Sequence, residues 1–114
     1  MNIQEIKDIA GENTADYANT AAMGYLDKSR DADCEKDKQY YLYQYELAMA
    51  VYSAHNAEYW AGSAEDTRNA RYYTDETEQE FDAQSRDIDA EYHRAQAELR
   101  FHRSQHHRQL WRNA

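Results

Sequence analysis

The sequence contains no proline and only three glycines in 114 residues. Proline and glycine are the residues that most often end a helix, and the β-branched residues that favour strands are also scarce here. Alanine, the best helix former, occurs 18 times. Few positions therefore force the chain out of a helix, and the sequence predicts an all-α fold.

The apolar composition allows one small core. Ile, Leu, Val and Phe together number only 12, a fraction more typical of disordered chains, but 11 tyrosines add large rings that can be buried. The length suits a single domain, predicted here to span residues 1–114. The opening residues lack the basic start and the apolar middle of a signal peptide, so a soluble cytoplasmic protein is expected.

Glycine and capping residues divide the chain into three predicted helices. Isoleucines at helical spacing indicate a short helix over about residues 2–11, which ends at Gly11. A second helix is predicted over about residues 14–61. Gly62 is typical of the residue after a helix end, and Ser63 with Asp66 forms a capping-box-like start. The third helix then covers about residues 63–112.

Two architectures fit these segments. If the charged run of residues 27–38 is a connection, the chain forms a slender three-helix bundle. If that run stays helical, residues 14–61 and 63–112 form a long antiparallel hairpin folded at Gly62. Reflecting one helix onto the other about residue 62 gives a partly apolar seam, which slightly favours the hairpin.

The third segment carries a seven-residue repeat, which is typical of a coiled-coil seam that faces another helix. Its positions alternate by four and three residues, and the presence of one serine and two histidines predicts a weak seam. The positions are Phe81, Ser85, Ile88, Tyr92, Ala95, Leu99, His102 and His106.

The second segment carries two apolar faces about 200° apart on a helix of 3.6 residues per turn. One face is mostly alanine and begins at Tyr43, which predicts close approach of another helix and a core role for this ring. The other face is rich in tyrosine, a residue that interfaces favour because it combines a large ring with a hydroxyl group. We therefore expect its four tyrosines to contact a partner: Tyr41, Tyr45, Tyr52 and Tyr59.

No motif in the sequence indicates catalysis or a cofactor. His102 and His106 have the i, i+4 spacing of zinc ligands, but Arg103 stands where metalloproteases carry glutamate, and several arginines nearby would repel a cation. Carboxylates are abundant, but none has a recognisable pocket that would make it a general acid or base. The sequence therefore predicts no enzyme activity, no metal site and no cofactor.

The charge is distributed unevenly along the chain. Residues 1–93 hold 21 acidic and 8 basic residues, whereas residues 94–114 hold five arginines and one glutamate. A net charge of −9 makes direct binding to nucleic acid or to anionic membranes unexpected. A row of carboxylates on the third segment predicts contact with a basic, nucleic-acid-binding protein instead: Asp75, Glu76, Glu78, Glu80, Asp82, Asp87, Asp89 and Glu91.

Together these features favour a non-enzymatic binding protein that inhibits a nucleic-acid-handling complex, such as a nuclease or a defence system, partly by mimicking DNA charge. In type, the chain is similar to the small inhibitor proteins that bacteriophages use against host nucleases and immune complexes, although no stretch matches a family motif. The alternative is a structural or adaptor protein, including a homodimer, that self-associates through its tyrosine and heptad faces.

Overall fold

The computed structural model describes residues 15–114 and is all-α in this range. Three helices follow one another: α2 (Ala15–Arg30), α3 (Glu35–Asn69) and α4 (Glu76–Asn113). Their arrangement is elongated, with principal extents of 61 × 23 × 19 Å. The radius of gyration of 17.5 Å exceeds the roughly 13 Å of a compact domain of this length. None of the helices in the described range is long and apolar enough to cross a membrane.

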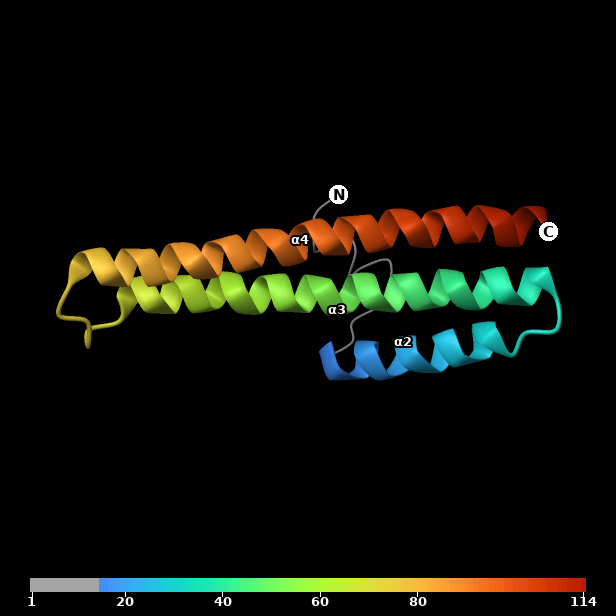
Figure 1. Ribbon diagram of the computed structural model, residues 1–114, viewed down its shortest axis with the longest axis horizontal. Helices are drawn as coiled ribbons and strands as arrows, with labels where there is room; N and C mark the ends of the chain where they lie inside the picture. Colours follow the sequence, from blue (N-terminus) through green and yellow to red (C-terminus); the bar gives the residue numbers. More distant parts are fainter. Residues whose placement is uncertain (1–14) are drawn as a thin grey trace.

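Helix α3 lies in the middle of the arrangement (Figure 1). It packs against α4 along most of its length and against α2 at its first half, while no contact between α2 and α4 is found among the described residues. The expected three-helix and hairpin architectures are thus combined, because α3 and α4 form a long antiparallel hairpin on which α2 folds back. The predicted helix over residues 2–11 lies outside the described residues.

The predicted continuous helix over residues 14–61 is wrong, because residues 31–34 separate α2 from α3. This connection lies inside the charged run that the three-helix alternative treated as a loop. Cys34 stands at the N-cap position of α3 with an extended backbone, and Glu35 and Asp37 follow in the first turn. Acidic side chains there interact favourably with the positive end of the helix dipole.

The predicted turn at Gly62 is also wrong, because α3 continues through Gly62 and ends at Asn69. A glycine inside a helix costs about 1 kcal/mol relative to alanine, which burial of the surrounding alanines can offset. The turn covers residues 70–75 instead. The Gln79 side chain donates hydrogen bonds to the carbonyl oxygens of Thr67 (2.7 Å) and Ala70 (2.9 Å), which satisfies helix-end acceptors of α3.

Alanines form the contact between α3 and α4. Along α3 they recur every seven residues at Ala50, Ala57 and Ala64, and each is almost fully buried. Along α4 the matching buried row is Ala83, Ala90 and Ala97. Small side chains in this position allow two helix axes to approach closely. Between the first half of α3 and the second half of α4, Phe101 and Leu47 join Ala50, Ala54 and Ala97 in the main core cluster. Tyr43 packs against this cluster.

The predicted seam of α4 does not face α3. All eight of its residues are exposed in the structure, and the alanine row on the opposite side of α4 faces α3 instead. Polar contacts explain this choice. They join positions of α4 that are seven or fourteen residues apart to α3: Gln79 to Thr67, Arg86 to Ser63, Arg100 to Glu46, and His107 to Gln39. Rotating the large apolar residues inward would separate these pairs.

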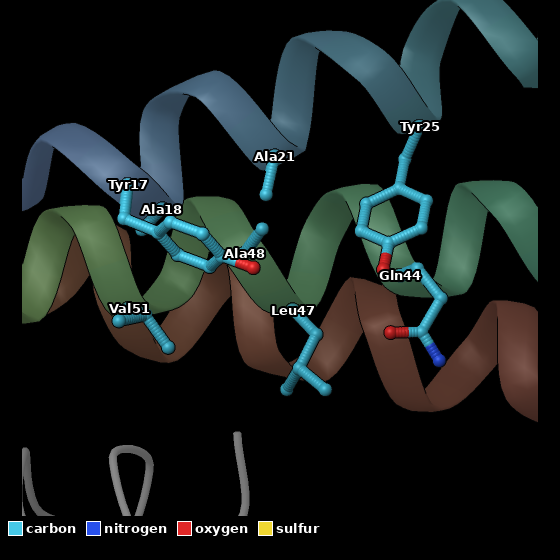
Figure 2. Close-up of a pocket in the computed structure, with 8 residues that line it drawn as sticks. All are labelled: Tyr17, Ala18, Ala21, Tyr25, Gln44, Leu47, Ala48 and Val51. Carbon is cyan, nitrogen blue, oxygen red and sulfur yellow. The ribbon is translucent and has the colours of Figure 1, made fainter. Parts of the chain in front are cut away.

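The contact between α2 and α3 is less complete. Figure 2 shows Tyr17 and Tyr25 reaching from α2 toward α3 on either side of Ala18 and Ala21, with Leu47 and Val51 beyond them. Because alanines line both helices here, a pocket of about 120 Å³ remains between them. We assign no chemistry to this pocket, because alanine, leucine and valine side chains make up much of its lining.

Candidate partner-binding surface

The predicted tyrosines do not form one continuous surface. Tyr41 lies near α2, where its ring is 5.9 Å from the ammonium group of Lys28. Tyr45 lies near α4, where the guanidinium group of Arg100 is 5.9 Å from its ring. Tyr52 is half-buried and lies farther along α3, between Tyr45 and Tyr59. Only Tyr59 is mainly exposed, at 67 %.

Tyr59 belongs to a groove between α3 and α4 that also contains predicted carboxylates. Its ring meets the ring of Trp60 edge-on, with centroids 5.3 Å apart. From α4, Asp82 and Asp89 line the same groove, seven residues apart on one side of the helix, together with Ser85 and Arg86. The structure therefore brings one predicted tyrosine together with two of the eight predicted carboxylates. We call these residues the aromatic–acidic groove.

Arg86 does not neutralise the whole groove. Its guanidinium group donates a hydrogen bond to the hydroxyl of Ser63 on α3, and this contact holds it at the helix interface. Asp82 accepts a hydrogen bond of 2.7 Å from the hydroxyl of Tyr73 in the turn. Hydrogen bonding to Asp82, with partial burial, raises the pKa of Tyr73 well above its usual value, so this phenol stays protonated and remains a donor.

Several predicted carboxylates are engaged within the chain. Glu80 and Asp87 both pair with Arg68 of α3, at 3.0 Å and 2.6 Å. These hydrogen bonds raise the pKa of Arg68 and lower that of Glu80. Asp75 caps α4 by accepting from the backbone N–H groups of Thr77 and Glu78, as N-cap aspartates do.

The remaining predicted carboxylates lie on the surface of α4. Glu76 and Glu78 are exposed near the turn, and the exposed Glu91 pairs with Arg94 on its own helix. Asp87, by contrast, is half-buried beside Arg68. The carboxylates are thus divided into a set that stabilises the hairpin and a set that faces solvent.

Sequence reasoning missed three residues of this surface, all on α3. Trp60 lines the groove, and Glu65 and Asp66 are exposed near the turn. Asp66 was interpreted as a helix cap after Gly62, which hid its place on a helix surface. The sequence feature that could have indicated Glu65 and Asp66 is the high density of acidic residues both before and after the turn.

The predicted histidine pair lies on the solvent side of α4. His102 and His106 are both exposed, and no group of three or more His, Cys, Asp or Glu residues among residues 15–114 is arranged to hold a metal ion. His107, which was not singled out, is the histidine in contact with α3, where its Nδ1 lies 2.6 Å from Oε1 of Gln39. Comparison of the chain with protein-family models, with curated proteins and with solved structures finds no match.

Proposed function

We propose that this chain is a non-enzymatic binding protein whose acidic half occupies the basic, nucleic-acid-binding surface of a partner protein. The observation that carries the proposal is the separation of charge along the rod. Residues 54–93, which form the half nearest the α3–α4 turn, contain eleven acidic and three basic residues. The rest of the described chain, residues 15–53 and 94–114, contains eight acidic and nine basic residues.

The folding of the hairpin produces this separation. The arginines of the α4 C-terminal part lie beside the start of α3, where Arg100 pairs with the buried Glu46. The eleven acidic residues on both sides of the turn are accompanied by only three arginines, of which Arg68 is shared by Glu80 and Asp87. One half of the rod is therefore strongly negative and the other is nearly neutral.

The aromatic–acidic groove supplies a specific contact within the negative half. A lysine or arginine of the partner could place its charge between Asp82 and Asp89 while its aliphatic part or guanidinium plane packs on Tyr59 or Trp60. Charge-assisted hydrogen bonds and cation–π contacts are the interactions that favour such an arrangement. Lysine and arginine side chains that normally contact DNA phosphates carry the positive charge and the aliphatic or planar parts that this groove would bind. This supports inhibition by charge mimicry.

The test is affinity capture from a lysate of the organism that carries the gene, followed by competition with duplex DNA. The expected partner is a nucleic-acid-binding protein that the chain retains at low salt and releases at high salt or on addition of duplex DNA. The variant Tyr59→Ala/Asp82→Asn/Asp89→Asn should capture it at least tenfold less.

The matched control is Asp31→Asn/Asp33→Asn, which removes two exposed carboxylates at the opposite, nearly neutral end of the rod. It should capture the partner as well as the parent chain does. A captured partner that is indifferent to duplex DNA and to the groove variant would overturn the proposal.

A further inference from the structure

The outer face of α4 carries large apolar side chains that no other described element covers. Phe81 is 66 % exposed, Ile88 69 %, Tyr92 59 % and Leu99 42 %. With Ala95 they occupy positions spaced by four and three residues, and the exposed Ser85, His102 and His106 continue the pattern. We call these eight residues the outer stripe.

The outer stripe is distinct from the contact that holds the hairpin together. The alanine row Ala83, Ala90 and Ala97 faces α3 and is buried, whereas the outer stripe lies on the opposite side of the same helix. From Phe81 to His106 the stripe extends over about 38 Å at 1.5 Å per residue. Contiguous apolar patches on this scale mark interaction sites more often than ordinary surface.

We propose that the outer stripe pairs with the outer stripe of a second copy of this chain, antiparallel, about a two-fold axis near His93 and Arg94. The proposal does not rest on the function proposed above, although both involve the acidic part of α4, and its tests measure self-association and not the capture of a partner. It requires only that the face be self-complementary when it is read in the opposite direction.

Side-chain size is complementary in that arrangement. The axis places Ile88 level with Leu99 of the second copy, so that two aliphatic side chains meet. It places Tyr92 level with Ala95 of the second copy, so that a large ring meets a small residue. Phe81 falls level with His106 and Ser85 with His102 of the second copy. Large side chains that face small ones across a helix pair help the two surfaces to interdigitate.

Charge is complementary as well. Residues 75–91 of α4 contain eight acidic residues and one arginine, whereas residues 94–112 contain five arginines and one glutamate. Antiparallel pairing lays the acidic part of each helix along the basic part of the other. Parallel pairing would place the acidic parts of the two helices side by side and the basic parts side by side. Repulsion between like charges at the flanking positions disfavours that arrangement.

One contact in the antiparallel arrangement is unfavourable. Glu91 falls within two residues, about 3 Å along the helix axis, of the level of Glu98 of the second copy, on the flank of the stripe. Glu91 already pairs with Arg94 on its own helix, and both members of this pair reach solvent, which weakens the repulsion. A single exposed contact of like charges does not outweigh the agreement of size and charge along the rest of the stripe.

The first test is the oligomeric state of the purified full chain by sedimentation equilibrium. We expect a reversible dimer, and we expect Ile88→Asn/Leu99→Asn to weaken dimerisation at least tenfold with an unchanged helical circular dichroism spectrum. The control Met23→Asn changes another exposed apolar residue, on α2, and should dimerise like the parent chain. A monomeric parent chain would overturn the proposal. If the monomeric chain also lost a captured protein when Ile88 was changed, the stripe would belong to a different partner.

The second test is the direction of pairing. A spin label at Gln84→Cys in a Cys34→Ser background, which removes the exposed native thiol, reports the separation of the two copies of this position. Antiparallel pairing predicts roughly 30 Å between the labelled positions, from the rise of an α-helix. A separation of about 10 Å, close to the distance between helix axes, would indicate parallel pairing and overturn the proposal.

Discussion

Glu46 of α3 and Arg100 of α4 form a salt bridge of 3.2 Å at the hairpin interface, with side chains only 10 % and 24 % exposed. Burial, the largest single influence, lowers the pKa of Arg100, but hydrogen bonding to Glu46 and the charge of Glu46, together with Tyr45, outweigh it and raise this pKa. The pair is 54 residues apart in sequence and fixes the register of the two helices.

Removing Arg100 should therefore destabilise the fold by leaving a buried carboxylate without its partner. For Arg100→Ala we expect the free energy of unfolding to fall by roughly 2–3 kcal/mol, somewhat less than for a fully buried pair. Urea denaturation followed by circular dichroism measures this change. The control Arg94→Ala breaks an exposed ion pair on the same helix and should change stability by no more than about 0.5 kcal/mol. Equal losses of unfolding free energy in the two variants would show that the Glu46–Arg100 pair stabilises the fold no more than an exposed ion pair does.

Tyr43 should behave as a core residue and Tyr59 as a surface residue. Tyr43 packs against the core cluster and stacks on Trp111, with ring centroids 6.2 Å apart and an interplanar angle of 17°. Truncation by Tyr43→Ala should cost roughly 2–4 kcal/mol of unfolding free energy, in the range of large-to-small aromatic changes. Tyr59→Ala should cost no more than about 0.5 kcal/mol, as exposed substitutions usually do. Similar losses in thermal melts of the two variants would contradict this assignment.

Gly62→Ala should stabilise the protein. Gly62 lies inside α3, and a Cβ atom added there meets no other atom within 4 Å. Replacing a helical glycine by alanine reduces the entropy of the unfolded chain, so we expect a gain of roughly 0.5–1 kcal/mol and a higher melting temperature. Gly24→Ala, at an equally open position in α2, is the matched comparison. A lower melting temperature for Gly62→Ala alone would place a turn at residue 62.

His107 should make stability depend on pH. Burial lowers the pKa of His107, against the charge of Glu46, which raises it, and with a smaller lowering effect of His106. Because its folded-state pKa lies below the unfolded value of about 6.5, the unfolded chain binds the proton first as pH falls. The contribution of neutral His107 is complete above about pH 6.5 and is lost as the pH falls toward its folded-state pKa.

Urea denaturation between about pH 5 and 8 measures this dependence. The loss of stability at low pH should be smaller in His107→Gln than in the parent chain. An identical slope in the parent chain and His107→Gln would show that His107 does not contribute.

The helical class, the uneven distribution of charge along the chain and the heptad spacings could be predicted from the sequence. The absence of proline and the abundance of alanine leave helix as the available structure, and a charge count requires no coordinates. The two apolar faces of α3 could also be read from spacing, but they do not divide between α2 and α4. Tyr45 of the tyrosine face lies near Arg100 of α4, and Leu47 of the alanine face lines the pocket beside α2. The aromatic–acidic groove was predicted in part, because Tyr59, Asp82 and Asp89 could be named, but their meeting with Trp60 could not.

Contacts between helices set where α3 ends and which face of α4 is buried. Gly62 resembles a helix end locally, but packing of Ala57 and Ala64 continues α3 past it, and Gln79 caps its end from another helix. On α4, the large apolar residues and the small alanines follow the same seven-residue period, so spacing alone cannot choose between them. Close packing of alanine rows, together with pairs such as Glu46 with Arg100, makes that choice, and it depends on residues far apart in the chain.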